Sequence, residues 1–305
     1  MSPMGESHQA KKELSVILVN YNDRVHLPAC LSSLEKALSG LSSEIILVDN
    51  HSDDGSSALV RSSFPWVTLI ENERNVGYPA ANNIGFKRSQ GAFVLFLNPD
   101  TVVPPAAAAA LLAEIKAHPE VGAIGPALVH ETGGFQVSFG KTVGFFSELR
   151  QKLILNPYYK MALRDSFKPL EVGWLSGACL LVKRAAVEAA GLFDESFFLY
   201  FEDIDLCRRI VSQGFKLVYF PAVRVFHKGG AATSLRRWKS RLEYRRSQLY
   251  FYWKYGSRLS RRLLRFYLRL SILALGASAP RDEEIKSYRR EMKEILRSRD
   301  IRVIG

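Results

Sequence analysis

The chain of 305 residues is long enough to bury a large core as one domain with an appended segment, and its 47% hydrophobic and 24% charged residues are ordinary for a soluble globular protein. Its three cysteines are widely spaced and form no C-x-x-C pair, so they offer neither a disulfide framework nor a zinc site and fit a reducing cytoplasm. Residues 1–12 are polar, and no apolar run approaches the roughly 18–20 residues that span a bilayer. We therefore expect a cytoplasmic protein with a flexible N-terminus over residues 1–12.

The net charge of +12 is concentrated at the C-terminal end of the chain. Residues 1–227 contain 21 lysines and arginines against 23 aspartates and glutamates, whereas residues 228–305 contain 21 against 7. This asymmetry bears on binding partners rather than on the fold. It favours a nearly neutral, catalytic body over residues 13–230 and a basic helical region over residues 231–305.

The first half of the chain alternates between short apolar runs and helix-like stretches. We predict strands over residues 14–19, 44–48, 67–70 and 93–97, and helices over residues 27–38, from about 53, over 77–87 and over 105–117. This alternation indicates βαβ units with a parallel sheet, whose polar strand ends would share one ligand-binding rim. The strand–helix junctions lack G-x-G-x-x-G and G-x-x-x-x-G-K-[ST], which argues against a dinucleotide fold with its usual fingerprint and against a P-loop.

The fourth predicted strand ends abruptly at a carboxylate. Its five large apolar residues, 93–97, are typical of a strand buried on both faces, and Pro99 cannot continue it, so Asp100 lies just past its carboxyl end. A carboxylate at this position can hold a divalent cation against a phosphate. The alternative is that Asp100 caps the helix that begins near Pro104.

The second half of the chain returns to regular structure after a long irregular stretch. We predict a strand over 121–125, a mobile substrate-side loop region up to about residue 171, then a strand over 179–182 and a helix over 184–190. Aromatic residues then lead into Glu202, Asp203 and Asp205 at the start of another helix. An acid pressed against aromatic rings acquires a raised pKa and can act as a base near neutral pH, although the helix dipole alone also favours acids there.

A histidine, His227, follows the strand-like runs 216–220 and 223–226. If it shares the rim with Asp100, the imidazole and the carboxylate make a partial shell for Mn²⁺ or Mg²⁺, which pyrophosphate oxygens would complete. A packed or solvated histidine is the alternative, and sequence spacing does not decide between them.

Over about residues 14–230 the chain resembles the family 2 glycosyltransferases of the GT-A fold, especially their rhamnosyltransferase-like branch. The motifs that carry this resemblance are Val19-Asn20-Tyr21-Asn22, Val48-Asp49-Asn50 with Ser52 and Asp54, Asn75-Val76-Gly77-Tyr78 leading to Ala81-Asn82-Asn83, Leu97-Asn98-Pro99-Asp100, Trp174-Leu175-Ser176-Gly177-Ala178, Gly191-Leu192-Phe193-Asp194-Glu195, Glu202-Asp203 and His227. The resemblance implies an α/β, Rossmann-like and mainly parallel central sheet flanked by helices, followed by the basic helical appendage.

The resemblance also implies roles for individual residues. Asp203 would be the general base with Glu202 beside it, and Asp100 and His227 would hold Mn²⁺ or Mg²⁺. The donor-binding residues would be Tyr21, Asn22, Asp49, Asn50, Asn75, Gly77, Asn83, Asn98 and Asp100, among which Asp49 contacts the nucleobase. The residues on the acceptor side would be Trp174, Ser176, Gly177 and Tyr200.

Two departures from the family pattern affect the donor side. Asn98 replaces the first acid of the family's D-x-D, which weakens metal binding but is common in the rhamnosyltransferase-like branch. Tyr78-Pro79 stands where the family usually has phenylalanine and a small residue, so the donor contacts there are open.

The implied reaction is a single displacement that inverts the anomeric centre of a nucleoside-diphosphate sugar. dTDP-rhamnose is the first candidate donor, and UDP-hexose or UDP-galactofuranose are alternatives. The implied acceptor is a polyprenyl-diphosphate-linked saccharide of bacterial cell-surface polysaccharide synthesis. A nucleotidyltransferase would use a similar sheet but usually opens with a glycine-rich loop, and a binding protein that has lost turnover is a further alternative.

The basic region contains an amphipathic pattern over residues 257–275. Five arginines fall within a sector of roughly 100° of a helix, with leucines and aromatic residues on the other side, which suits an anionic membrane surface. We expect a peripheral location on the inner face of the cytoplasmic membrane, with Arg236, Arg237, Lys239 and Arg241 near the lipid diphosphate. The alternatives are a helix packed on the body with a solvated basic face, and nucleic-acid binding, which we do not expect because the body contains no recognisable nucleic-acid module.

Overall fold

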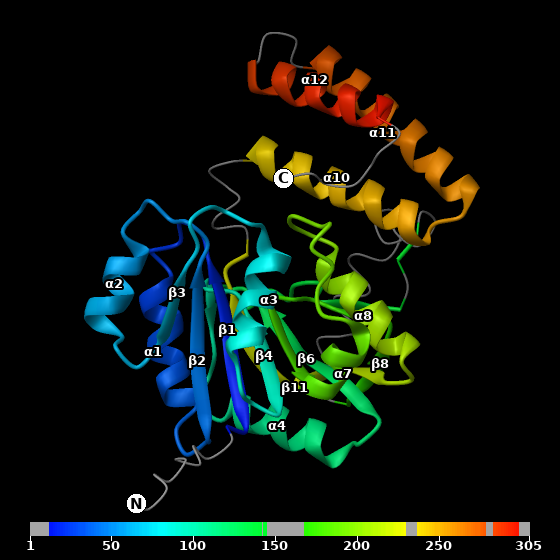
Figure 1. The fold of residues 1–305 in the computed structure, drawn as a ribbon. Helices are drawn as coiled ribbons and strands as arrows, with labels where there is room; N and C mark the ends of the chain where they lie inside the picture. The colour runs from blue at the N-terminus through cyan, green and yellow to red at the C-terminus, as the bar shows by residue number, and fades with distance from the viewer. Residues whose placement is uncertain (1–11, 142, 145–167, 230–236, 279–282, 299–305) are drawn as a thin grey trace, which may run out of the picture.

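The computed structural model describes residues 12–141, 143–144, 168–229, 237–278 and 283–298. A nine-stranded sheet lies in its middle, in the order β3-β2-β1-β4-β10-β6-β11-β5 with β8 paired to β11 (Figure 1). The strands are β1 Leu14–Asn20, β2 Ser43–Asp49, β3 Thr68–Glu71, β4 Phe93–Leu97, β5 Thr101–Val102, β6 Val121–Val129, β8 Leu170–Val172, β10 Cys179–Lys183 and β11 Lys216–His227. A separate two-stranded sheet pairs β7, Phe139–Gly140, with β9, Trp174–Leu175.

The sheet is mainly parallel, as the sequence predicts. Strands β1 to β4 are parallel to one another, β10 runs against β4 and β6, and β11 is parallel to β6. The carboxyl ends of β1, β2, β4, β6 and β11 therefore lie at the same edge. Asn20 and Asp49 are paired in register at this edge, so the polar residues that follow each strand come together.

Helices cover both faces of the sheet because the central strands are apolar on both sides. Val16, Leu18 and Leu95 pack against α1 and α4 on one face, whereas Ile17 and Phe96 pack against α3, α7 and α8 on the other. The helices of the body are α1 Leu27–Ala37, α2 Ser56–Ser63, α3 Tyr78–Arg88, α4 Ala107–Ala117, α7 Arg184–Ala190 and α8 Glu202–Ser212.

Several element boundaries differ from those predicted. β6 continues to Val129 instead of ending near residue 125, because its last residues pair with the end of β11 and are buried. β11 is one strand with a register shift between Phe220 and Arg224, where Pro221 interrupts the ladder. α2 starts at Ser56, after the left-handed Gly55 at φ 80°, rather than near residue 53. The predicted loop region lies mostly in residues 145–167, outside the described residues, as does most of the predicted flexible N-terminus.

Three C-terminal helices pack together over the carboxyl-end rim of the sheet (Figure 1). They are α10 Arg237–Tyr255, α11 Arg258–Ser278 and α12 Glu283–Arg297, and we call them the C-terminal helices. Leu249, Leu268 and Met292 of these helices form one core with Phe197 and Phe201 of the body. In the described part of the chain, no helix has the length and hydropathy needed to cross a membrane.

Candidate active site

A cavity of about 910 Å³ opens at the carboxyl-end rim of the sheet and is bounded on the other side by α10. Most of the residues predicted for the donor, acceptor, base and metal lie in its lining. They are Tyr21, Asn50, Asn75, Asn98, Asp100, Trp174, Ser176, Gly177, Tyr200, Glu202, Asp203 and His227. Residues separated by up to about two hundred positions thus meet at one place because their strands end at the same edge.

Two of the predicted donor residues, Asp49 and Asn22, lie behind the lining. Asp49 is 2% exposed, and its carboxylate accepts hydrogen bonds from Nδ2 of Asn20 at 2.7 Å and from the amide of Ser52 at 2.9 Å. The side chain of Asn22 accepts from the amide of Asp53, and its φ of 55° is in the left-handed region. Both side chains are engaged in shaping the loops after β1 and β2.

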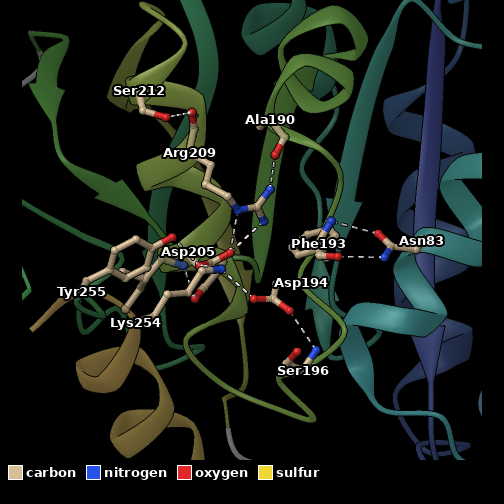
Figure 2. A network of polar contacts seen from close by, with 12 residues as sticks. Asn83, Ala190, Phe193, Asp194, Ser196, Asp205, Arg209, Ser212, Lys254 and Tyr255 are labelled. Carbon is tan, nitrogen blue, oxygen red and sulfur yellow. Dashed lines mark hydrogen bonds and ion pairs between the residues drawn. The ribbon is translucent and has the colours of Figure 1, made fainter. Parts of the chain in front are cut away.

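Gly77 and Asn83 also lie outside the lining and have structural tasks. Gly77 has a φ of 86°, and a Cβ there would meet the side chain and backbone of Phe198 at 2.9 Å, so only glycine fits. Asn83 is 3% exposed and exchanges two hydrogen bonds with the backbone of Phe193, as Figure 2 shows. The amide of Asn83 is therefore turned toward the loop before α8 and away from the donor side of the cavity.

Asp100 and His227 meet through the short strand β5. β5 runs antiparallel to the end of β11, with Thr101 opposite His227, so the residue before β5 lies beside the histidine. Oδ1 of Asp100 is 3.3 Å from Nε2 of His227, and Oδ2 accepts a hydrogen bond from the amide of Gly229. Burial alone would raise the pKa of Asp100, but the contacts with His227 and Gly229 outweigh it and hold this pKa below its ordinary value. Asp100 is thus a carboxylate at neutral pH.

These two side chains fit a divalent cation. A carboxylate oxygen and an imidazole nitrogen that face each other at this distance are suitable ligands for Mn²⁺ and acceptable ones for Mg²⁺. Among the described residues there is no group of three or more His, Cys, Asp or Glu side chains that could hold a metal. Asp100 and His227 are thus the two ligands that the described residues would supply, with phosphate oxygens and water as further ligands.

Asp203 lies in the first turn of α8 and lines the same cavity. The turn before this helix places Tyr200 and Phe201 at φ values of 71° and 67°, a conformation that is rare for aromatic residues and typical of functional sites. The two carboxylate oxygens of Asp203 accept hydrogen bonds from the amides of Gly177 and Ile204, each at 2.8 Å. The carboxylate is therefore held in one orientation.

The neighbouring Glu202 is 5% exposed, and its Oε2 has no hydrogen-bond partner among the described residues. Burial, and then the charge of Asp203, raise the pKa of Glu202 well above its ordinary value. Burial also raises the pKa of Asp203, but the backbone amides at Gly177 and Ile204 act in the opposite direction. Because two amides donate to Asp203 and none reaches Oε2 of Glu202, the hydrogen bonds favour the charge on Asp203 and the proton on Glu202.

A buried network connects α8 to the C-terminal helices (Figure 2). Asp205, with 0% exposure, accepts hydrogen bonds from Arg209 at 2.8 Å and from Lys254 and Tyr255 of α10 at 2.7 Å each. Lys254 also contacts Asp194 at 2.6 Å, in the loop before α8. Burial lowers the pKa of Lys254, but the two carboxylates outweigh it and raise this pKa. The sequence did not predict this network, because Asp205 and Lys254 are 49 positions apart and no local pattern connects them.

We predict that Lys254→Met lowers the free energy of unfolding by about 3–5 kcal/mol, because it leaves the buried carboxylate of Asp205 without a cation from α10. The matched control is Lys286→Met, which removes an exposed ion pair with Glu283 and should cost about 0–1 kcal/mol. Urea denaturation of both variants measures the difference. Equal losses in the two variants would contradict the importance of the network.

A second prediction concerns the pH dependence of stability. The pKa of Glu202 is raised in the folded state, so its contribution to stability is complete below the pKa of an unfolded glutamate and is lost as pH rises through the folded pKa. Glu202→Gln does not titrate, so its Tm relative to wild type should rise between pH 5 and pH 8.5. Glu188→Gln, at an exposed position, should show no such trend. A Glu202→Gln difference that is constant or falls with pH would show that the carboxyl is not held in its neutral form.

The sequence matches the model of glycosyl transferase family 2 over residues 15–191. An N-acetylglucosaminyl-diphospho-decaprenol L-rhamnosyltransferase from Mycobacterium tuberculosis is 30% identical over 298 residues, which cover 92% of this chain and 97% of that protein. A match of this length includes α10 and α11 as well as the body.

Two solved structures have a similar fold. The mannosyltransferase PcManGT from Pyrobaculum calidifontis, in complex with GDP-Man and Mn²⁺, aligns with a TM-score of 0.57 at 16% identity over 94% of this chain and 88% of that one. GalNAc-T7 with UDP, GalNAc and Mn²⁺ aligns with a TM-score of 0.56 at 17% identity over 94% of this chain and 56% of that one. The chain has the GT-A fold and belongs to glycosyl transferase family 2, where it is similar to the rhamnosyltransferases.

Proposed function

We propose that the protein is a metal-dependent, inverting glycosyltransferase that moves a sugar from a nucleoside-diphosphate donor to a hydroxyl of a lipid-linked saccharide. The observation that carries this proposal is that one cavity is lined by both the Asp100–His227 pair and the carboxylate of Asp203. The name of the mycobacterial relative supports L-rhamnose as the sugar and a polyprenyl-diphosphate saccharide as the acceptor. dTDP-rhamnose is therefore the first donor to test, followed by UDP-hexose and UDP-galactofuranose.

The donor would lie along the strand ends. Tyr21 and Asn75 line the cavity after β1 and β3 and would meet the nucleoside. Asn50, after β2, is 2% exposed, and its amide donates to Oδ1 of Asn75 and so holds that side chain in place. Asp49, behind them, would act on the nucleobase through the loop that it stabilises at Ser52. Asp100 and His227 would hold Mn²⁺ or Mg²⁺, which when bound offsets the negative charge that grows on the departing diphosphate.

Asp203 would act as the general base. As the acceptor oxygen attacks the anomeric carbon, its proton passes to Asp203, and the bond between that carbon and the diphosphate oxygen breaks on the opposite face. The amides of Gly177 and Ile204 hold the carboxylate in place for this transfer. A single displacement of this kind inverts the anomeric configuration.

The acceptor would bind between α8 and α10. Oε2 of Glu202 and Nε1 of Trp174 are buried polar atoms without a hydrogen-bond partner among the described residues, and both residues line the cavity. A sugar hydroxyl would satisfy Oε2 of Glu202, whereas Nε1 of Trp174 lies against Gly140 of the neighbouring strand. Tyr200, which also lines the cavity, would offer an aromatic face. Among the residues predicted to lie near the lipid diphosphate, Lys239 lines the cavity. Arg236 lies outside the described residues.

The α11 helix would bind the surface of an anionic membrane on the cytoplasmic side. The sequence pattern predicted a single apolar side on this helix, but the structure has two. One apolar stripe, Leu264, Leu268 and Ile272, packs into the C-terminal core. A second apolar stripe is exposed, at 50% to 61% for each member: Leu259, Phe266, Leu270 and Leu273. Three exposed arginines, Arg258, Arg262 and Arg269, lie on the same helix, and a surface with leucines, phenylalanine and arginines complements anionic lipid.

Asp203→Asn should lower the transfer rate by a factor of about 10²–10⁴, because the amide retains the shape of the carboxylate but accepts no proton. Donor binding, measured as the thermal shift with dTDP or UDP and Mn²⁺, should stay within a few-fold of wild type. Transfer at a near wild-type rate would contradict the assignment of the base. An unresponsive wild-type protein with every nucleotide tested would contradict the proposed function itself.

Replacing both Phe266 and Leu270 by glutamate should weaken binding to phosphatidylglycerol-containing vesicles by about tenfold or more, since it removes apolar contacts and repels the anionic surface. Vesicle co-sedimentation measures this, with phosphatidylcholine vesicles for comparison. Val211→Glu, at an exposed apolar position on α8, is the matched control. Unchanged sedimentation of the double variant would eliminate α11 as the membrane contact.

A further inference from the structure

We propose that Gln136 determines which nitrogen of His227 carries the ring proton and thereby prepares Nε2 as a metal ligand. This inference rests on the proposed function, in which His227 binds the cation. Gln136 belongs to none of the motifs in the sequence and lies in the segment after β6. Its backbone amide donates to the carbonyl of Leu128 at 2.9 Å, which fixes the segment beside the end of β11.

The side chain of Gln136 contacts His227 at two points. Its Nε2 donates to the backbone carbonyl of His227, and its Oε1 is 2.7 Å from Nδ1 of the imidazole ring. A backbone carbonyl only accepts hydrogen bonds, so the amide group must present its NH₂ end there and its oxygen to the ring. Since this oxygen also only accepts, Nδ1 must carry the proton. In the neutral ring the lone pair is then on Nε2.

The other side of the ring faces both an amide and a carboxylate. The hydroxyl of Tyr78 donates to Oδ1 of Asn98 at 3.0 Å, which turns the NH₂ group of Asn98 toward His227. Nδ2 of Asn98 is 3.3 Å from Nε2 of the ring, and an amide NH₂ group needs an acceptor. A proton on Nε2 would oppose this contact but would suit Oδ1 of Asp100, which is also 3.3 Å from Nε2. The hydrogen bond from Nδ1 to Gln136 therefore sets the tautomer against the preference of the Asp100 carboxylate, and it leaves the lone pair on Nε2, where a cation would lie between the two side chains.

This arrangement has a specific consequence for the cation. A histidine binds a metal through a nitrogen that carries no proton, and the hydrogen bond at its other nitrogen sets the tautomer and the ring orientation. Removal of such a partner typically costs about 10–100-fold in metal affinity. Because Asn98 stands in place of an acid, Asp100 and His227 are the two proposed protein ligands among the described residues. A change in the tautomer of His227 should therefore have a large effect on metal affinity.

The test uses Gln136→Met, which is similar in length but neither donates nor accepts strongly at these points. Gln90→Met, at an exposed glutamine away from the cavity, is the matched control. Selective ¹⁵N-histidine labelling at pH 8 reports the tautomer, with the His227 resonances assigned from a His227→Ala variant. Electron paramagnetic resonance of free Mn²⁺, with and without dTDP, reports the affinity.

We expect wild type to carry the His227 proton on Nδ1, and Gln136→Met to shift it toward Nε2 and to bind Mn²⁺ about 10–100-fold more weakly. The control should match wild type in both measurements. A wild-type proton on Nε2, or a Gln136→Met variant with unchanged Mn²⁺ affinity, would overturn the inference. Because the tautomer is read without metal, absence of Mn²⁺ binding in wild type would count against the metal in the proposed function and not against the tautomer.

Discussion

The buried carboxylate of Asp205 joins the two parts of the molecule that form the cavity. A charge with 0% exposure needs hydrogen bonds on all sides, and here they come from Arg209 of its own helix and from Lys254 and Tyr255 of α10. Asp203 lies two residues before it. The position of Asp203 over the sheet rim therefore depends on the contact between α8 and the C-terminal helices. Through Asp194, the same lysine also fixes the loop whose backbone leads into the turn at Tyr200.

Parallel strands supply the other half of the cavity. The register of β1 with β2 places Asn20 next to Asp49, and the parallel end of β4 places Asn98 beside them. These relations follow from alternation and from runs of apolar residues, so most strands, the parallel sheet and the rim could be predicted from the sequence. The family motifs added Asp203, Asp100 and His227, the residues proposed as base and metal ligands, and all three line one cavity.

The remaining features depend on contacts that no local pattern contains. Asp100 meets His227 only because β5 pairs with the end of β11, and a two-residue strand has no periodicity to detect. Gln136 lies 91 positions from the histidine that it contacts. The α11 helix has apolar residues on two sides, and its sequence does not tell which side packs on α10 and α12. The arginines predicted to form one basic sector also differ in their surroundings. Arg261 and Arg265 donate to the carbonyls of Gly256 and Leu296, whereas the other three are exposed.

In the proposed reaction, different residues of the cavity would handle the negative charge of the leaving group and the proton of the acceptor. The leaving diphosphate would face Asp100 and His227 at the strand ends, and the acceptor proton would move to Asp203 beneath α10. The most direct measurement is a crystal structure of the full chain with dTDP and Mn²⁺. We expect the cation between Oδ1 of Asp100 and Nε2 of His227, in contact with the diphosphate, and the nucleoside along Tyr21, Asn50 and Asn75. A nucleotide bound elsewhere, or a cation held without both of these side chains, would contradict this division of the cavity.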